Sequence, residues 1–312
     1  MAVSITTQLV LDAARKRGWK VELYPIKSGL SAIILPDGRE YFLKGLRSYK
    51  SGAVNTFIAD NKDLAQLLVT EMGIQIPDSQ LFQADLQAAE AFLQKHGFVV
   101  VKPLNSAHGL GVTVSIDTVS KLRRAISNAQ RYSRVVMLQQ HITGDDYRVL
   151  VIDHHIVAAA IRKPAYVIGD GMHTIEQLIR RENANDKRGP GYNKQLCYVD
   201  MQAAKQFLGQ NLVSIPAHGE EVRVMGVANI GRGGVSIDKT DTLNAYMTKD
   251  AIRLTQRLRL GVCGVDFIVA EDGKHYFIEM NSQPSLGLHS YPYTGQSRDV
   301  ANKFLDWLVK DA

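Results

Sequence analysis

The chain has 312 residues, of which 45% are hydrophobic and 22% charged, a globular composition with enough length for about two domains. This excludes a disordered chain, a collagen-like repeat and a disulfide scaffold, and no apolar run reaches the roughly 18 residues of a membrane-spanning helix. The net charge of +6 is spread along the chain in clusters expected on solvated helix faces, so it only weakly indicates a phosphate-bearing ligand.

The cysteines and the N-terminus suggest where the protein works. Cys197 and Cys263 are too few for a disulfide framework and too isolated for a zinc site, so we expect two reduced thiols. The N-terminal residues lack the apolar core of a signal peptide. The sequence therefore predicts a cytoplasmic protein.

The first 56 residues are predicted to form a short α/β unit. A helix is expected at about 7–17, followed by strands near 21–24, 31–35 and 40–43, and the Pro36-Asp37-Gly38-Arg39 turn joins the last two strands. Apolar residues at helical spacing, with Gly73 as a stop, then predict a helix over 62–72.

A strand, a glycine-bearing loop and a second strand follow at 98–103 and 112–116. This order excludes the Walker loop and the dinucleotide fingerprint, which both run from a strand into a helix. Lys102 ends an apolar strand and so needs an anionic partner, and the glycine loop would let backbone N–H groups approach phosphate oxygens. The alternative is an ordinary glycine-rich hairpin loop, braced by His108.

The rest of the chain alternates strands with helices. Strands are expected at 135–139, 147–152 and 156–161, and helices at about 174–185, 248–260 and 298–309. Asn183–Asn193 is the most loop-like stretch, either a mobile segment over a site or a plain connector.

Strand-borne polar residues indicate a ligand cleft. Asp146 and Arg148 share one face of a strand, and Arg162 and Arg223 lie on other predicted strands. Guanidinium groups suit phosphate or carboxylate ligands. Taken singly, each of these residues is more often an ordinary salt-bridge partner than a ligand-binding residue.

The sharpest local pattern is a predicted hairpin around Asp272-Gly273. A two-residue loop at this dipeptide pairs Glu271 with Lys274 and, further out, Asp266 with Glu279. Opposed buried carboxylates need a cation between them. Asn281 would add an amide oxygen on the same face, and such a set suits Mg²⁺ or Mn²⁺. The alternative is a Lys or Arg that neutralises the pair.

These segments, in this order, resemble the ATP-grasp superfamily, most closely the ATP-grasp region of cyanophycin synthetase and of bifunctional glutathione synthetases. The resemblance runs from about residue 57 to 310. It is carried by these motifs: Ile58-Ala59-Asp60-Asn61-Lys62, Gly73-Ile74-Gln75-Ile76-Pro77, Val101-Lys102-Pro103, His108-Gly109-Leu110-Gly111-Val112, Asp146-Tyr147-Arg148-Val149-Leu150-Val151, Arg162-Lys163-Pro164-Ala165, Gly169-Asp170-Gly171, Ala228-Asn229-Ile230-Gly231-Arg232-Gly233-Gly234, Gly264-Val265-Asp266 and Glu279-Met280-Asn281-Ser282-Gln283-Pro284.

The resemblance implies roles for individual residues. Lys62 and Lys102 would contact the phosphates of ATP, and the loop with His108, Gly109, Gly111 and Val112 would close over them. Asp146 would bind the ribose hydroxyls. Two Mg²⁺ or Mn²⁺ ions would be held by Asp266, Glu279 and Asn281. Positions on the γ-phosphate and acyl-acceptor side would be filled by Arg148, Arg162 and Asn229.

Three departures from the family pattern leave the substrates open. The nucleotide hinge reads Gln139-Gln140-His141-Ile142 where a Glu is common, so adenine would contact backbone groups there. A family arginine is replaced by Met225, and Arg223 on the same strand face is the candidate substitute. After Pro284, Ser285-Leu286-Gly287 lacks an arginine expected on the substrate side.

We therefore predict an α+β ATP-grasp fold with three segments: 1–56, an N-terminal lobe at 57–140 and a C-terminal lobe with the metal site at 141–312. The expected function is an ADP-forming carboxylate–amine ligase acting through an acyl phosphate on a small-molecule carboxylate and amine, either amino acids or peptides. The alternatives are a catalytically silent nucleotide-binding regulator, a ligase that modifies a protein or ribosome-associated substrate, and a basic nucleic-acid binder. Because exposed amphipathic helices often mediate dimers in such enzymes, a homodimer is favoured; no membrane or nucleic-acid partner is expected.

Overall fold

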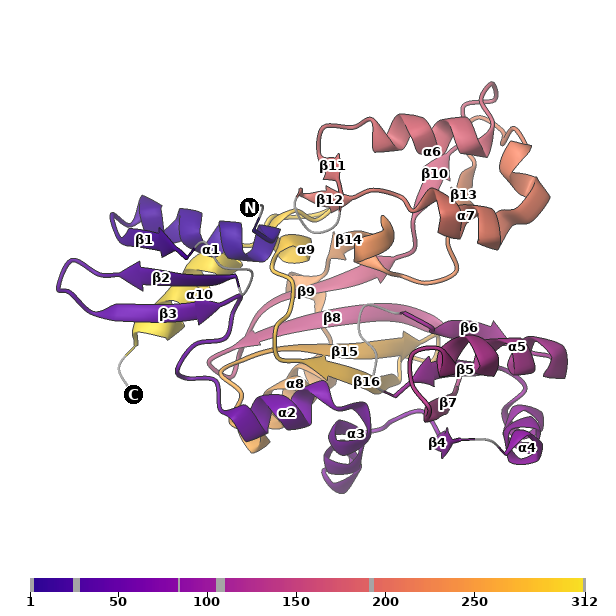
Figure 1. Cartoon of the computed structure of the whole chain (residues 1–312), viewed down its shortest axis with the longest axis horizontal. Helices are drawn as coiled ribbons and strands as arrows, with labels where there is room; N and C mark the ends of the chain where they lie inside the picture. The colour runs from indigo at the N-terminus through magenta and orange to yellow at the C-terminus, as the bar shows by residue number, and fades with distance from the viewer. Residues whose placement is uncertain (1–2, 25–28, 84, 105–109, 191–193, 311–312) are drawn as a thin grey trace. The chain divides into compact units, whose positions relative to one another are not determined.

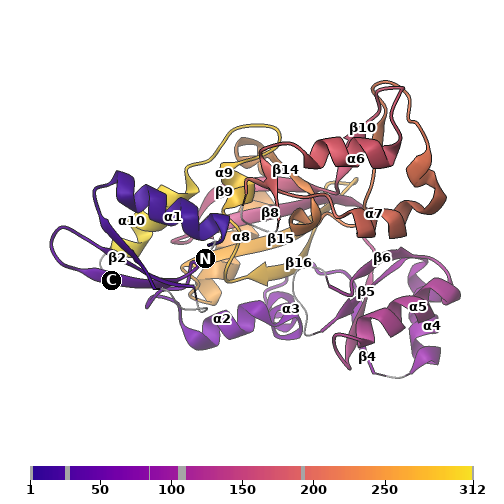
Figure 2. The ribbon, with the colours of Figure 1, turned by 45° about the horizontal axis from the view of Figure 1, so that its top comes forward.

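The computed structural model of the chain describes residues 3–24, 29–83, 85–104, 110–190 and 194–310. The backbone divides into two compact units. Unit 1 comprises Met1–Thr56, Asp146–Val265 and Asn281–Ala312, and unit 2 comprises Phe57–Asp145 and Asp266–Met280. Figure 1 labels the helices and strands, and Figure 2 gives a second view.

Unit 1 begins with a helix and a three-stranded antiparallel sheet. The helix α1 (Ile5–Lys16) starts at Ser4, whose hydroxyl accepts the N–H of Thr7 at 3.2 Å. The sheet has the order β1-β2-β3, formed by β1 (Lys20–Leu23), β2 (Leu30–Ile34) and β3 (Glu40–Lys44). The helix and three strands predicted for this segment are confirmed.

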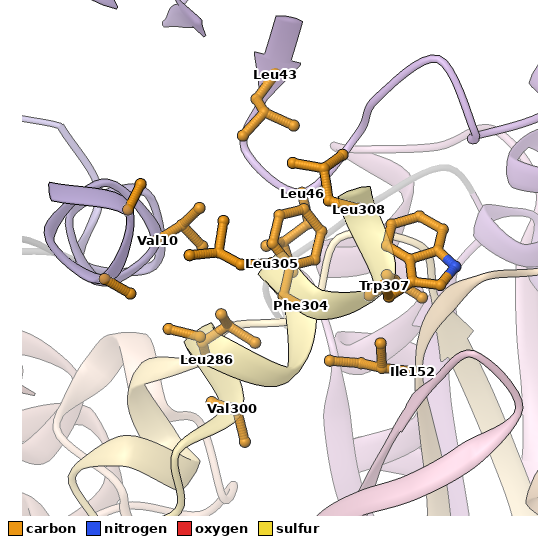
Figure 3. Packing of buried hydrophobic residues seen from close by; sticks show 14 of the residues in the cluster. Val10, Leu43, Leu46, Ile152, Leu286, Val300, Phe304, Leu305, Trp307 and Leu308 are labelled. Atoms are coloured by element: carbon orange, nitrogen blue, oxygen red, sulfur yellow. The ribbon is translucent and has the colours of Figure 1, made fainter. Parts of the chain in front are cut away.

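This N-terminal segment shares its hydrophobic core with the C-terminal helix α10 (Val300–Val309). Figure 3 shows side chains of α1 and β3 gathered around Phe304 and Leu305 of α10, both of them fully buried. Leu286 and residues of the large sheet belong to the same cluster. Burial of one continuous apolar surface therefore joins residues 1–56 to the rest of unit 1, whereas the sequence suggested a separate segment.

The large sheet carries Asp146, Arg148 and Arg162 together with the three candidate metal ligands. Its order is β14-β9-β8-β15-β16, with β8 (Gly144–Ile152), β9 (His155–Lys163), β14 (Val235–Asp238), β15 (Val262–Ala270) and β16 (His275–Asn281). The turn between β8 and β9 uses Asp153 and His154, both with positive φ, as the tightest hairpin turns require. The antiparallel register of β8 and β9 places Asp146 opposite Arg162 and Arg148 opposite Ala160.

A group of short elements between β9 and β14 builds a core of its own. It contains β10 (Tyr166–Ile168), α6 (Ile175–Asn183), β11 (Arg188–Gly189), β12 (Leu196–Cys197), α7 (Met201–Leu208), η2 (Gly209–Val213) and β13 (Glu221–Arg223). Thr174 and Gln177 form a capping box at the start of α6. The predicted loop-like stretch thus contains β11, and its residues 191–193 lie outside the described residues.

Both cysteines are buried and free, as expected. Burial raises the pKa of the Cys197 thiol to about 11, so this thiol stays protonated at neutral pH. The remaining elements of unit 1 are η3 (Ile230–Arg232), η4 (Thr240–Thr242), α8 (Ala245–Arg257) and α9 (Gly287–Ser290).

Unit 2 is built on a four-stranded sheet with the order β4-β7-β5-β6, formed by β4 (Ser79–Phe82), β5 (Val99–Pro103), β6 (Thr113–Ile116) and β7 (Val136–Gln140). The helices α4 (Leu86–His96) and α5 (Val119–Gln130) pack on it through a core that includes Phe92, Leu122 and Leu138. Two further helices, α2 (Ala53–Asp60) and α3 (Lys62–Glu71), lead into the sheet. The predicted strand, glycine loop and strand correspond to β5 and β6, which pair antiparallel.

Among the residues that the structure describes, none of the helices has the length and apolar run needed to span a bilayer.

An ion pair at the start of α10 offers a test of the packing of unit 1. Arg298 donates from Nη2 to Asp238 at 2.5 Å and to Asp241 at 2.6 Å, and the Asp238 side chain is only 8% exposed. Because removing one partner of an ion pair costs about 1 kcal/mol at the surface and 3–5 kcal/mol when buried, we expect Arg298→Met to lower the free energy of unfolding by about 2 kcal/mol in urea titrations at pH 7. Lys274→Met, which removes a cation from an exposed ion pair, should leave the free energy of unfolding without a measurable change.

The same pair predicts a pH dependence. Burial by itself would raise the pKa of Asp238, but hydrogen bonds from Arg298 and Thr240 outweigh it and hold this pKa below its usual value. A depressed pKa stabilises the fold above the unfolded-state pKa and loses that effect as the pH falls. The difference between the parent and Arg298→Met should therefore shrink below about pH 4; a constant difference down to pH 2 would contradict this assignment.

Candidate active site

Lys102 is the penultimate residue of the fully buried strand β5 and is itself 8% exposed. Its ammonium donates a hydrogen bond of 2.5 Å to Oε1 of Gln139, which lies on the neighbouring strand β7 and is 2% exposed. The amide oxygen of Gln139 is a neutral acceptor. A buried lysine beside a neutral amide is suited to hold an anionic ligand as well.

The glycine loop is described only at its end. His108 and Gly109 lie outside the described residues, whereas Gly111 and Val112 lead into β6. Gly111 has a φ of 74°, and a Cβ there would come within 2.7 Å of Pro103 and of the Tyr132 ring. Glycine is therefore required at this position both by backbone conformation and by space.

The remaining predicted nucleotide residues of unit 2 lie at element ends. Lys62 is the first residue of α3, Gln140 is the last of β7, and Ile142 lies two residues after that strand. The backbone N–H of Gln140 donates to Asp78 at 2.8 Å, and that of His141 donates to Phe98 at 3.0 Å. Both of these groups are thus committed to protein partners.

In unit 1 the sheet brings three predicted residues near one another. Asp146 and Arg162 lie opposite each other on β8 and β9 and form an ion pair of 2.5 Å, with both side chains largely buried. Arg148, two residues along β8, is 5% exposed. The salt-bridge reading of Asp146 and Arg162 is therefore correct in this structure, and an acidic and a basic group occupy the face predicted for a ligand.

The side chain of Arg148 lies against Gly264, near the start of β15. A Cβ on Gly264 would lie 3.0 Å from Cδ of Arg148 and 2.9 Å from Pro284. Three motifs that are far apart in the sequence thus meet around one glycine, and its missing side chain leaves the room that the arginine occupies.

Arg223 and Asn229, the other two residues predicted for the acceptor side, lie at or just after the end of the group of short elements between β9 and β14. Arg223 ends β13, donates through Nε to the carbonyl of Met225 at 2.7 Å and through Nη2 to that of Gly226, and lies over the Phe207 ring. Burial lowers the pKa of its guanidinium. Asn229, half-buried, precedes η3. Part of the donor capacity of Arg223 is therefore used within its own loop.

The predicted two-residue turn at Asp272-Gly273 is wrong. Ala270 donates its N–H to the carbonyl of Lys274 and Gly273 donates to Ala270, both at 2.9 Å, so the loop has three residues and ends in a glycine with a φ of 81°. Asp272 Oδ1 accepts the N–H of Lys274, which favours this turn.

A one-residue change in the turn exchanges the two faces of a hairpin. The Phe267 and Phe277 rings lie 6.2 Å apart, which agrees with the pairing that starts from this longer turn. Hairpin symmetry therefore no longer requires Asp266 to face Glu279. The metal assignment rests instead on the family resemblance and on the donor set.

The donor set does fit a hard divalent cation. Asp266 on β15 is 1% exposed, and Glu279 and Asn281 on β16 are half-buried. Asn281 Oδ1 accepts the N–H of Gln283 at 2.8 Å, which orients the amide oxygen and leaves its second lone pair. Among the described residues no cluster of three or more His, Cys, Asp or Glu could hold a metal, so a site here must include the amide oxygen.

A buried strand lysine before a glycine loop, a polar face on β8 and a carboxylate-bearing hairpin on β15 and β16 define a protein of the ATP-grasp class. The family model described as a RimK-like ATP-grasp domain matches residues 59–166 and 220–308. The chain belongs to this family. The gap between the matched segments coincides with most of the inserted elements from β10 to β13.

Comparisons over nearly the whole of this chain agree with this family assignment. The chain is 32% identical to the glutathione biosynthesis bifunctional protein GshAB of Listeria innocua and 27% identical to that of Enterococcus faecalis; the matches cover 99% of this chain but 42% and 43% of the relatives. The crystal structure of a bifunctional glutathione synthetase from Pasteurella multocida superposes with a TM-score of 0.72 at 25% identity, over 98% of this chain and 43% of that one. The fold alone is shared with D-alanine–D-alanine ligase from Bacillus anthracis, with a TM-score of 0.52 at 17% identity over 83% of this chain and 69% of the ligase.

These results confirm the resemblance to the ATP-grasp superfamily and the α+β ATP-grasp fold. The chain spans about two fifths of the length of the curated relatives that it matches.

Proposed function

We propose that this chain is an ADP-forming carboxylate–amine ligase. It would transfer the γ-phosphoryl group of ATP to a carboxylate and let an amine displace phosphate from the acyl phosphate, which forms an amide bond. The observation that supports this most is the buried, strand-borne Arg148 in a RimK-like ATP-grasp chain that also keeps Lys102 and the three metal donors.

The nucleotide roles follow from the family pattern. Lys62, Lys102 and the loop that ends in Gly111 and Val112 would bind the phosphates, with His108 and Gly109 in that loop. Gln139, Gln140 and Ile142 would contact adenine, and Asp146 the ribose. The Gln139 amide keeps the Lys102 ammonium at the end of β5, so the cation is already in place when ATP binds.

Asp266, Glu279 and Asn281 would hold Mg²⁺ or Mn²⁺, two ions in the family pattern, which neutralise charge on the transferring phosphoryl group. Lys102, Arg148 and Arg162 would add positive groups, and preorganised groups of this kind stabilise the transition state without reorganising during the reaction. Asn229 would orient the acceptor.

A carboxylate acceptor is favoured over an alcohol. Arg148, Arg162 and Arg223 carry guanidiniums that bind carboxylates through paired hydrogen bonds. A carboxylate oxygen is already nucleophilic and needs no general base, whereas a kinase must deprotonate its alcohol. These arginines therefore support ligase chemistry over phosphorylation of a hydroxyl.

Amino acids or short peptides are the proposed substrates. The curated relatives are named for glutathione biosynthesis, a route that joins amino acids. In this chain Ser285-Leu286-Gly287 replaces the arginine-bearing pattern of the family, so its specificity should differ. We further propose a cytoplasmic location, a homodimer, and small molecules rather than nucleic acid as partners.

The proposal is tested by trapping the intermediate. We expect an ADP-release screen over pairs of amino acids and short peptides, with ATP and Mg²⁺, to identify a carboxylate substrate. Hydroxylamine in place of the amine should then give a hydroxamate with ADP, because it attacks the acyl phosphate. A stable phosphorylated alcohol, or cleavage of ATP to AMP and pyrophosphate, would rule out this reaction.

A further inference from the structure

We propose that Arg47 is a positioning residue through which the N-terminal segment fixes the orientation of Asn281. The family model begins at residue 59, so residues 1–56 lie outside the matched domain. The inference rests on the proposed metal role of Asn281. It assigns the N-terminal segment a part in metal binding.

The first contact joins the end of β3 to the residues after β16. The turn between Lys44 and Arg47 is closed by backbone hydrogen bonds in both directions, at 2.9 and 3.1 Å. From this turn Arg47 Nη2 donates to the hydroxyl of Ser282 at 3.1 Å, and Ser282 is 4% exposed. A guanidinium on a closed turn thus holds the residue that directly follows Asn281.

The second contact involves the next residue, Gln283. Its side-chain amide lies between a carbonyl, which only accepts, and a guanidinium, which only donates, so the orientation of the amide is determined. The nitrogen donates to the carbonyl of Lys44 at 2.9 Å, and the oxygen accepts from Arg47 Nε at 3.2 Å. The turn therefore holds both Ser282 and Gln283.

Gln283 passes this constraint to the candidate ligand. Its backbone N–H donates to Oδ1 of Asn281 at 2.8 Å. A planar amide held at one lone pair presents the other in a defined direction, and a divalent cation tolerates little error in ligand direction. The chain of contacts from Arg47 through Gln283 to Asn281 therefore connects the N-terminal turn with the oxygen atom proposed to bind the metal.

The same segment is held a few residues further along. Leu286 donates its N–H to the buried hydroxyl of Thr6 at 3.1 Å. A Cβ on Gly287 would lie 2.9 Å from the Ile5 side chain. Residues 282–287 are thus held by the β3 turn at one end and by the start of α1 at the other, and Leu286 belongs to the core shown in Figure 3.

The experiment measures metal binding directly. Mn²⁺ is titrated into protein saturated with a non-hydrolysable ATP analogue, and free Mn²⁺ is followed by electron paramagnetic resonance. We expect Arg47→Ala and Ser282→Ala each to raise the Kd of Mn²⁺ at least about fivefold, because Asn281 loses its fixed orientation. Ser282→Ala removes one hydroxyl, which keeps the test available if Arg47→Ala folds poorly.

The matched control is Arg39→Ala, which removes an arginine at the exposed hairpin between β2 and β3 of the same sheet and should leave the Mn²⁺ Kd within twofold. Mn²⁺ affinity within twofold of the parent in both test variants would overturn the inference, even if Arg47→Ala lowers the melting temperature. A parent protein that binds no Mn²⁺ with the analogue would instead overturn the metal role of Asn281 in the proposed function.

Discussion

Glu279→Gln is expected to lower the rate of ADP release about 1,000-fold, because one anionic metal ligand becomes neutral while the shape of the side chain is kept. Asp266→Asn should have an effect of the same size. Circular dichroism and the melting temperature should show both variants folded, since each substitution preserves volume on the hairpin of β15 and β16.

The control for this prediction is on the same hairpin. Asp272 is exposed at the turn and pairs with Lys274 at 2.7 Å, so Asp272→Asn changes one carboxylate without touching the proposed metal donors. Its ADP release should stay within twofold of the parent. If Glu279→Gln retained more than about a tenth of the parent rate, the metal assignment would be wrong.

Lys102→Met is expected to weaken binding of a non-hydrolysable ATP analogue about 30-fold in calorimetry, because a charge-assisted contact with the phosphates is lost. The substitution keeps the length and apolar stem of the side chain in the buried strand β5. It also leaves Oε1 of Gln139 without its lysine donor, so some loss of stability should accompany it.

Lys95→Met provides the comparison within unit 2. Lys95 is exposed on α4 and pairs with Asp78 at 2.6 Å. This variant should bind the analogue as the parent does. Equal affinity of Lys102→Met and the parent would mean that Lys102 serves only to satisfy the buried Gln139 amide.

Much of the fold followed from local patterns in the sequence. Apolar periodicity predicted α1, α3, α6, α8 and α10 with ends that differ by no more than about three residues, and strand–loop–strand order excluded the helix-based nucleotide motifs. The burial of Lys102 and Asp266 was also predictable, because each lies within an apolar strand. A charged side chain in such a strand needs a partner of opposite charge or a hydrogen-bond partner.

Long-range and register-dependent features could not be predicted in this way. Asp272-Gly273 is compatible with both a two-residue and a three-residue hairpin loop, and the structure has the three-residue loop, with a hydrogen bond from Lys274 to Asp272. The ion pair of Asp146 with Arg162 depended on the register of β8 and β9. The contacts of Arg47 join residues more than 200 positions apart, where no local pattern carries information.

The central claim, a carboxylate activated as an acyl phosphate, is tested most directly by following its oxygen. With the carboxylate substrate labelled with ¹⁸O, attack on the γ-phosphorus followed by displacement by the amine must leave one labelled oxygen in inorganic phosphate. We predict one ¹⁸O per phosphate released, measured by mass spectrometry, in equal amount to ADP. Phosphate without label, or label appearing in AMP, would contradict the account.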